Sequence, residues 1–296
     1  MTYSVVVAAG VLLLAGAVGL NAQDAAPSVP KVKMPLIIAH RGVPTETPEN
    51  TMGAFRRSLE QDADAIETDL RLTGDGKIIL IHDPGTKRTC GTPNRVVAET
   101  SFDELRKLDA GKWKGEQFAG EKLPTLTELL EIVPPEKMVF LEIKCGPEIV
   151  PQFVRELRAS KLKPEQIRVI TFNDAVIPAF KAAMPEVQAF LLYEFKRDEA
   201  GKWSDTAENL VRRAKALGAD GLDLSVKPKT MEPVTPALVA AAKAQGMSFH
   251  AWTIDDAAIA RHAIALGAES LTTNRAGGLR RELQEGSGTT QPAGPQ

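Results

Sequence analysis

The chain has 296 residues, with 36 Lys and Arg against 38 Asp and Glu, so its formal net charge is −2. No run of like charge interrupts this balance, which argues against a nucleic-acid partner because such proteins carry a basic excess or a basic face. Apolar residues make up 43% and charged residues 25%, enough for a sizeable core and a solvated surface.

The first predicted element is an apolar N-terminal segment. No charged residue occurs from Val5 to Leu20, and small residues follow it. The pattern is typical of a signal peptide, and the run is shorter than the ~20 apolar residues of a membrane span. We therefore expect residues 1–22 to be removed and the protein to be exported, to the periplasm or outside the cell, without stable membrane insertion. A retained anchor is the alternative, since no Lys or Arg precedes the run.

Two further terminal segments lack the composition of a folded domain. Residues 23–34, which contain Pro and several Ala, are predicted to be a linker, and residues 285–296 a disordered tail. Residues 35–284 remain for the folded domain.

Within this domain, short apolar runs alternate with amphipathic helical patterns, which is typical of a parallel sheet covered by helices. The strand-like runs are Leu36–Ala39, Ala65–Leu72, Ile78–Ile81, Met138–Ile143, Ile167–Phe172, Val187–Tyr193, Gly221–Leu224, Met247–Ile254 and Ser270–Thr273. The helical patterns are Asn50–Gln61, Leu126–Ile132, Glu148–Ser160, Asp174–Ala183, Thr206–Leu217, Pro236–Gln245 and Asp256–Leu266.

One of these runs does not fit a parallel sheet. Ile78–Ile81 follows Ala65–Leu72 after a connection too short for a parallel crossover, which needs a dozen or more residues. Asp75-Gly76 between the two runs is instead a hairpin signal. Without this antiparallel return strand, eight parallel strands remain, and the predicted fold is a TIM-type (β/α)8 barrel with a β-hairpin extension after the second strand and a small insertion at residues 84–124.

The hairpin also predicts which side chains converge. If Asp75-Gly76 is a two-residue loop, Asp69 lies opposite His82, and directly opposed residues point to the same face of a sheet. Glu67, two residues from Asp69, shares that face. A slip of one residue would remove this convergence, so the prediction depends on the register.

Ionisable side chains follow the strands one after another. Reactive groups in α/β barrels lie at the C-terminal ends of the strands. Here those ends carry His40, Arg41, Glu67, Asp69, His82, Glu142 and Lys144. The sequence thus predicts one site at this end of the barrel.

The motifs at these positions resemble the signature of the glycerophosphodiester phosphodiesterase family over about residues 36–275. The matching segments are His40-Arg41-Gly42, Pro48-Glu49-Asn50-Thr51, Glu67-x-Asp69, Thr73-x-Asp75-Gly76, His82-Asp83, Leu123-Pro124-Thr125-Leu126, Glu142-Ile143-Lys144, Thr171-Phe172 and Trp252-Thr253.

The resemblance implies a TIM-type barrel that hydrolyses small glycerophosphodiesters to glycerol 3-phosphate and an alcohol. It implies a divalent cation bound by Glu67, Asp69 and Glu142. It also implies that His40 and His82 are catalytic, and that a glycerol hydroxyl attacks phosphorus to give a cyclic phosphate that water then opens.

The residue chemistry agrees with these expectations. Three carboxylates without clustered Cys or His form a hard oxygen site, suited to Mg²⁺ or Ca²⁺ rather than Zn²⁺. Arg41 can bind phosphate oxygens in a bidentate manner, and Lys144 can act as a point charge. Two histidines can share general acid and base catalysis near neutral pH. Trp252 is expected to form a wall of the substrate pocket.

Several residues keep two interpretations. Asn50 is at least as well explained as a helix N-cap as by a contact at the site. His250 is expected to be buried and hydrogen-bonded rather than catalytic. Asn274 stands where many relatives have Asp, so a contact there would lack a charge. Cys90 and Cys145 are either two separate thiols or one disulfide, which export would permit.

Three other classes of protein compete with this interpretation. A lysophospholipase D or sphingomyelinase D-like enzyme would need an apolar rim for the acyl chain of its substrate. Residues 84–124 carry Phe102, Trp113 and Phe118, but the many charged residues between them do not form a clear apolar rim. A non-catalytic phosphodiester-binding barrel has no need of both histidines and all three carboxylates. A zinc amidohydrolase is disfavoured because the chain has no His-x-His.

Overall fold

The computed structural model describes Met1 and residues 34–285. Residues 2–22 of the predicted signal peptide, residues 23–33 of the predicted linker and residues 286–296 of the predicted tail lie outside the described residues. Among the described residues, no helix is long and apolar enough to cross a membrane.

Eight parallel strands form a closed barrel, as the sequence predicted. The strand order is β1-β9-β8-β7-β6-β5-β4-β2, and pairing between β1 and β2 closes the barrel. The barrel strands are β1 (Leu36–Ala39), β2 (Ala65–Leu72), β4 (Met138–Ile143), β5 (Ile167–Thr171), β6 (Gln188–Tyr193), β7 (Gly221–Ser225), β8 (Ser248–Trp252) and β9 (Ser270–Thr273).

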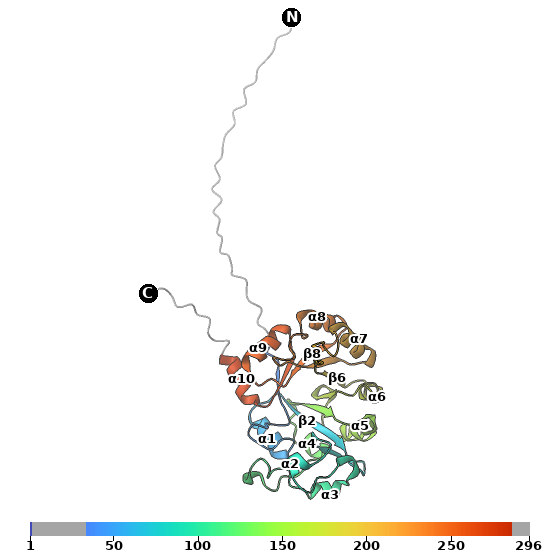
Figure 1. Cartoon of the computed structure of the whole chain (residues 1–296), viewed down its shortest axis with the longest axis vertical. Helices are drawn as coiled ribbons and strands as arrows, with labels where there is room; N and C mark the ends of the chain where they lie inside the picture. Colours follow the sequence, from blue (N-terminus) through green and yellow to red (C-terminus); the bar gives the residue numbers. More distant parts are fainter. Residues whose placement is uncertain (2–33, 286–296) are drawn as a thin grey trace, which may run out of the picture. The chain divides into compact units, whose positions relative to one another are not determined.

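Helices surround these strands (Figure 1). They are α1 (Met52–Glu60), α4 (Leu126–Ile132), α5 (Val150–Ala159), α6 (Val176–Ala183), α7 (Ala207–Leu217), α8 (Pro236–Ala244), α9 (Ala257–Leu266) and α10 (Ala276–Glu285), with short 3₁₀ turns η3 (Pro147–Ile149) and η4 (Pro164–Gln166). The sequence did not predict α10, and Glu285, which it assigned to the tail, is the last residue of that helix.

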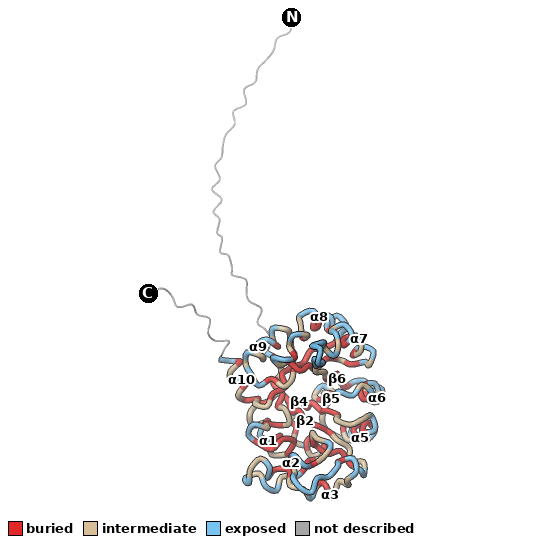
Figure 2. The backbone as a smooth tube through the Cα atoms, in the orientation of Figure 1, coloured by how far each residue is buried: buried red, intermediate tan, exposed pale blue. Residues whose placement is uncertain are grey.

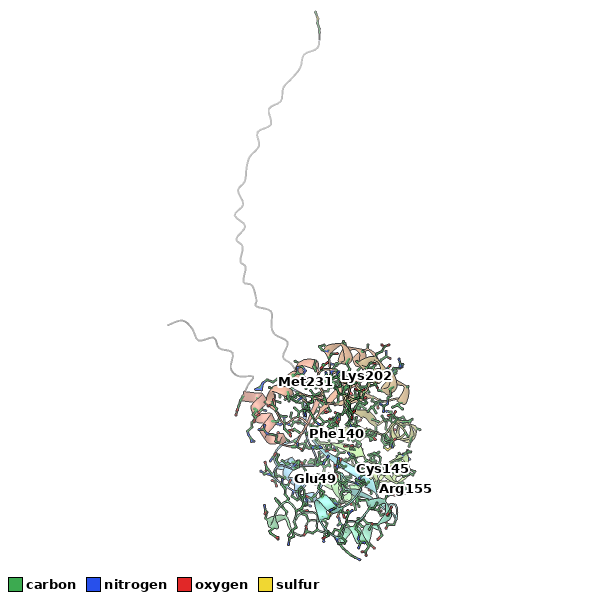
Figure 3. All side chains as sticks on the ribbon, in the orientation of Figure 1. Glu49, Phe140, Cys145, Arg155, Lys202 and Met231 are labelled. Atoms are coloured by element: carbon green, nitrogen blue, oxygen red, sulfur yellow. The ribbon has the colours of Figure 1, made fainter. Side chains whose placement is uncertain are left out.

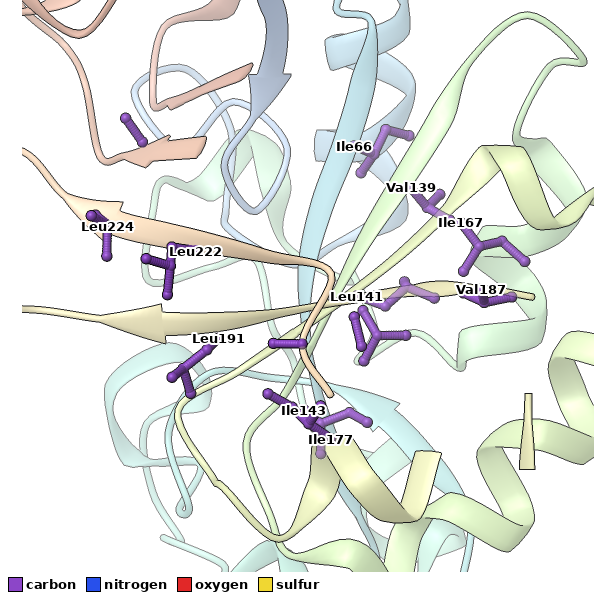
Figure 4. Packing of buried hydrophobic residues seen from close by; sticks show 14 of the residues in the cluster. Ile66, Val139, Leu141, Ile143, Ile167, Ile177, Val187, Leu191, Leu222 and Leu224 are labelled. Atoms are coloured by element: carbon purple, nitrogen blue, oxygen red, sulfur yellow. The ribbon is translucent and has the colours of Figure 1, made fainter. Parts of the chain in front are cut away.

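The core has two parts because the strands are buried on both faces. Outward-facing residues such as Val139, Leu141 and Leu222 pack beneath the helices (Figure 4). A smaller cluster, which includes Phe140 and Phe190, fills the interior of the barrel. Figure 2 shows the strands as buried and the outer sides of the helices as exposed. The interior of the barrel is therefore packed, and a site formed by the strands is expected at an end of the barrel.

The antiparallel hairpin is present, but its loop differs from the prediction. Strand β3 (Ile78–Leu80) pairs with β2, and Thr73 lies opposite Lys77, with the Thr73 amide donating to the Lys77 carbonyl at 2.8 Å. The loop is therefore Gly74–Gly76, one residue longer than expected. Gly76 has a φ of 80°, the left-handed conformation that such three-residue hairpin loops require.

This loop shifts the register by one residue, so the prediction that Asp69 faces His82 was wrong. Ile81 donates its amide to the Asp69 carbonyl at 2.9 Å, and Ile81 is the residue opposite Asp69. His82 nevertheless lines the same cavity as Glu67, because β3 ends at Leu80 and the strand alternation no longer constrains His82.

The insertion at residues 84–124 packs on the outer face of the hairpin. It contains α2 (Lys87–Cys90), η1 (Val97–Glu99), α3 (Phe102–Arg106) and η2 (Glu116–Phe118). A separate apolar cluster joins Ile79 and Ile81 of the hairpin to Val97, Leu105 and Leu123 of the insertion. The insertion thereby anchors the segment that leads into His82.

Cys90 and Cys145 are both free thiols in this structure. Cys145 follows β4, and Cys90 ends α2 (Figure 3 labels Cys145). Of the two interpretations that the sequence left open, the structure has the separate thiols.

Candidate active site

A cavity of about 350 Å³ lies at the C-terminal end of the barrel. Its walls include most of the residues that the sequence singled out. The lining residues are His40, Arg41, Glu67, His82, Glu142, Lys144, Ile170, Phe172, Leu192, Asp223, Lys227, Trp252, Thr253 and Thr272. Larger hollows elsewhere, such as that between α4 and α5, contain no such cluster of histidines and carboxylates.

Three buried carboxylates meet at one side of this cavity. Asp69 on β2 lies opposite Glu142 on β4, and Glu67 is two residues earlier on β2. One carboxylate oxygen from each lies within 4.8 Å of the others. Glu67 Oε1 and Asp69 Oδ1 are buried without a hydrogen-bond partner. Because buried polar atoms are rarely left unpaired, this oxygen cluster fits a hard divalent cation.

Burial and mutual repulsion oppose full ionisation of the cluster. Burial raises the pKa of Glu67 well above its usual range, and the charges of Asp69 and Glu142 add to the effect. Burial and the charge of Asp69 raise the pKa of Glu142 to about 7. Burial also opposes ionisation of Asp69, but Arg41 and Lys144 outweigh it and lower the pKa of Asp69. A cation would relieve this repulsion.

Arg41 and Lys144 are the two positive charges next to the cluster. Arg41 Nε lies 3.0 Å from Asp69 Oδ2, and the Arg41 amide donates to Glu67 Oε2 at 2.8 Å. Lys144 Nζ donates to Glu142 Oε1 at 2.8 Å. The Arg41 guanidinium and the Lys144 ammonium are thus both placed to contact a phosphate bound beside the carboxylates.

The loop after β1 approaches α1 too closely for any residue but glycine. Gly42 has a φ of 87°, and a Cβ added to it would lie 2.5 Å from the Cβ of Ala54. This contact fixes the loop that presents His40 and Arg41 to the cavity.

The orientation of His40 is set by an amide. His40 Nδ1 hydrogen-bonds to Asn274 Oδ1 at 2.7 Å, and Asn274 Nδ2 donates to Asp255 Oδ2 at 2.6 Å. Since an amide oxygen only accepts, Nδ1 carries the proton and Nε2, which lies 4.0 Å from Glu67 Oε2, is left for the cavity. Burial lowers the pKa of His40 to about 4, and the charge of Arg41 acts in the same direction.

His82 is oriented by a carboxylate instead. His82 Nδ1 donates to Asp83 Oδ1 at 2.6 Å, and Arg88 Nε donates to Asp83 Oδ2 at 2.7 Å. Arg88 also contacts both oxygens of Glu49, and Glu49 accepts from Arg41 at 3.1 Å. Burial lowers the pKa of His82, and the bond to Asp83 opposes this shift. This chain of ion pairs connects the two histidine loops (Figure 3 labels Glu49).

Of the two interpretations of Asn50, the structure has the contact at the site and not the helix cap. Thr51 is the N-cap of α1, and its side chain accepts from the Ala54 amide. Asn50 has a φ of 54°, donates from Nδ2 to Asp69 Oδ2 at 2.8 Å and accepts from the Thr68 hydroxyl at 2.7 Å. The residue therefore orients one of the clustered carboxylates.

Arg71 is a residue that sequence reasoning missed. Its Nε donates to the His82 carbonyl at 2.8 Å, and its Nη1 donates to the Lys144 carbonyl at 3.2 Å. The two segments that these bonds hold are 62 residues apart in the chain. An isolated Arg within a strand gave no signal for this role, because both partners are backbone atoms.

The wall opposite the carboxylates is aromatic. Trp252 and Phe172 contact each other edge to face, with centroids 5.6 Å apart, and Trp252 Nε1 donates to the Asp223 carbonyl at 3.0 Å. Lys144 Nζ lies 5.8 Å from the centroid of the Phe172 ring, and Lys227 Nζ lies 5.2 Å from the centroid of the Trp252 ring. Trp252 thus lies in the cavity wall where the sequence placed it.

His250 is buried and hydrogen-bonded, as expected. Its two ring nitrogens contact the hydroxyls of Ser248 and Ser270 at 2.8 and 2.7 Å, and its ring stacks on Phe190 at 4.2 Å. Burial lowers its pKa to about 3. Both nitrogens are occupied, so His250 has none free to contact a ligand.

Comparison with known proteins gives the family of the chain. The glycerophosphoryl diester phosphodiesterase family matches residues 40–277. A glycerophosphodiester phosphodiesterase of Caldanaerobacter subterraneus is 32% identical over 244 residues, covering 81% of this chain and 93% of that protein. One of Bacillus subtilis is 28% identical and covers 81% of this chain and 83% of its own length.

A solved structure of an Oleispira antarctica phosphodiesterase, in complex with the product sn-glycerol-3-phosphate, has a TM-score of 0.73 and 25% identity. It covers 84% of this chain and 97% of that one. The chain belongs to the glycerophosphoryl diester phosphodiesterase family, and it is a phosphodiesterase that acts on small glycerophosphodiesters.

Proposed function

We propose that this cavity hydrolyses glycerophosphodiesters to glycerol 3-phosphate and an alcohol, with a divalent cation at Glu67, Asp69 and Glu142 and with His40 and His82 as proton donors and acceptors. The observation that carries the proposal is the cluster of three buried carboxylates, two of whose oxygens accept no hydrogen bond, in the cavity that both histidines line.

The bound cation would stabilise negative charge on the phosphate. The residues of the chain itself have separate tasks. Arg41 and Lys144, which contact the carboxylates in this structure, turn to the non-bridging phosphate oxygens, on which charge accumulates during attack at phosphorus. Mg²⁺ and Ca²⁺ both suit the all-carboxylate ligand set.

One histidine moves a proton at the attacking oxygen, and the other moves a proton at the leaving oxygen. One accepts the proton of the hydroxyl oxygen that bonds to phosphorus. The other donates a proton to the alcohol oxygen as its bond to phosphorus breaks. When the attacking hydroxyl belongs to the glycerol, this step leaves a cyclic phosphate. Water then attacks phosphorus and gives its proton to the second histidine, while the first protonates the glycerol oxygen that leaves, and glycerol 3-phosphate results. Asn274 and Asp83 hold the Nδ1 atoms, and each Nε2 is left to exchange the proton.

The rim of the cavity favours a small alcohol over an acyl chain. Among the described residues, the large apolar side chains with high exposure are Met1, Met34, Val96, Trp113 and Phe172. Of these, Phe172 alone lines the cavity. One exposed ring offers little surface to a lipid tail, so we favour soluble glycerophosphodiesters over lysophospholipids.

The direct test is to incubate the purified protein with glycerophosphocholine and glycerophosphoethanolamine, with and without chelator, and to identify products by ³¹P NMR. We expect glycerol 3-phosphate in the untreated samples. Formation of choline phosphate or ethanolamine phosphate instead would show cleavage on the other side of phosphorus and contradict the proposal.

We also propose that the mature protein is exported after loss of residues 1–22. The uncharged apolar run from Val5 to Leu20 supports this proposal. N-terminal sequencing of native material is expected to begin near Gln23, and a sequence that begins at Met1 would contradict it.

A further inference from the structure

Asp223 is a buried carboxylic acid at the floor of the cavity that the proposed reaction does not use. It lies on β7, is 1% exposed and lines the cavity. Its register partners are Leu192 on β6 and His250 on β8, both of which face the barrel interior. Asp223 Oδ1 is buried and has no hydrogen-bond partner among the described residues, although the residue lines the cavity.

No positive charge compensates this carboxyl group. Among residues 34–285, Asp223 forms no ion pair, and Lys227 on the same side of the cavity pairs with Glu194 at 3.1 Å. Both ring nitrogens of the neighbouring His250 are already bound to serines. Burial, with the charge of Glu142 across the cavity, raises the pKa of Asp223 well above its usual range. This environment disfavours the charged form of the group, and its carboxyl oxygens accept no hydrogen bond from the described residues.

We propose that Asp223 binds the terminal hydroxyl of the substrate's glycerol, the hydroxyl on the carbon farthest from the phosphate, and so selects the glycerol half of the diester. A carboxyl oxygen accepts a hydrogen bond from a hydroxyl in either protonation state, and a protonated carboxyl group also donates one. This inference rests on the proposed function, since it assumes that the phosphate binds beside Glu67, Asp69 and Glu142.

The shape of the cavity supports this orientation of the substrate. The phosphate end is defined by the carboxylates of β2 and β4, while β7 lies across the barrel. Beside Asp223, Leu192 and Ile170 are buried and offer an apolar wall to the glycerol carbons. Phe172, 45% exposed, marks the open rim. The closed end thus suits the part common to all glycerophosphodiesters, and the open end suits the alcohol that varies.

The test compares kcat/KM of two proteins on two substrates, which gives four values. Wild type and Asp223→Leu are compared on glycerophosphoethanolamine and on the analogue that lacks the terminal hydroxyl, 2-hydroxypropyl phosphoethanolamine. We expect Asp223→Leu to lower kcat/KM for the glycerol substrate about 10²-fold and to leave the analogue, already slow with wild type, nearly unchanged. Asp223→Asn, which keeps a donor and an acceptor, is expected to retain more of the preference. An equal loss for both substrates in Asp223→Leu would overturn the proposal.

Binding separates this proposal from the proposed function. Calorimetry with sn-glycerol 3-phosphate and 2-hydroxypropyl phosphate, with Mg²⁺ or Ca²⁺ present, needs no turnover. We expect wild type to prefer glycerol 3-phosphate and Asp223→Leu to lose that preference. If the wild type binds with this preference but cleaves neither diester, the proposed function fails while the role of Asp223 stands. Equal binding of both ligands by wild type would refute the role. Thermal unfolding checks that Asp223→Leu is folded, and Asp223→Asn supplies the same comparison if it is not.

Discussion

The contact between His40 and Asn274 allows the proton affinity of a proposed catalytic group to be changed by exchanging two side chains. Asn274 accepts from His40 Nδ1 and donates to Asp255 Oδ2, at 2.7 and 2.6 Å. Asn274→Asp combined with Asp255→Asn keeps both hydrogen bonds and reverses the second. The carboxylate then lies next to the imidazole, where it favours the imidazolium, so the pKa of His40 must rise from about 4.

The expected rise is about one pKa unit. A neutral hydrogen bond contributes ~1 kcal/mol and one with a charged group ~1.5–3 kcal/mol, a difference of ~0.5–2 kcal/mol, and 1.36 kcal/mol corresponds to one unit. Asn274→Asp alone is the control, because two carboxylates 2.6 Å apart would share a proton and weaken the effect.

Two readouts test this prediction. NMR titration follows the imidazole resonance of His40, which is assignable because the chain has only four histidines. The pH dependence of kcat/KM follows the limb that His40 controls. We expect both to move upward in the double variant. An unmoved resonance would show that the bond to Asn274 does not form in solution. A moved resonance with unmoved limbs would show that His40 does not govern the rate.

Three further predictions follow from the site. His40→Ala and His82→Ala are each expected to lower kcat by ~10²–10⁴-fold while His262→Ala, an exposed position, does not; a p-nitrophenyl leaving group is expected to rescue only the variant that lacks the acid. Asn50→Ala is expected to weaken cation binding by ~10–100-fold in a calorimetric titration, since it releases a carboxylate ligand; unchanged affinity would remove Asn50 from the site. Because burial lowers the pKa of His250, the unfolded chain binds a proton there below pH 6.5 and the folded protein does not, so the free energy of unfolding falls as the pH falls. Between pH 7 and 5, His250→Gln is expected to lose ~2 kcal/mol less of this free energy than wild type; equal losses in urea unfolding would contradict the burial argument.

The sequence predicted the barrel well because its signals are local. Apolar runs such as Ala65–Leu72 and Met138–Ile143 and the helical pattern Leu126–Ile132 have the same bounds in the structure, and the other predicted bounds agree to within two residues. The helix Ala276–Glu285 was missed because its Gly277-Gly278 pair and few apolar residues weaken the periodic signal.

The site was only partly predictable. Strand ends and family motifs named the residues that meet at the cavity, but the partners that orient them depend on tertiary contacts. Asn274 lies 234 residues from His40, and Arg71 contacts backbone atoms, which no side-chain pattern reveals.

The hairpin shows a second limit. A two-residue loop and a three-residue loop are both compatible with Thr73-Gly74-Asp75-Gly76. The longer one forms because the Thr73 hydroxyl binds Asp75, while the Gly74 amide binds the Thr100 carbonyl of the insertion. The second contact is not visible in the hairpin sequence.

Metal dependence tests the central claim most directly. The protein is treated exhaustively with EDTA, its metal content is measured by elemental analysis, and hydrolysis of glycerophosphoethanolamine is assayed before and after adding Mg²⁺ or Ca²⁺. Glu67→Gln, which keeps the size of the side chain but removes a ligand charge, serves as the matched variant. We predict that the metal-free wild type is inactive, that one of the two cations restores its activity, and that Glu67→Gln requires a much higher cation concentration. Full activity in a sample proven to contain no metal would contradict the account.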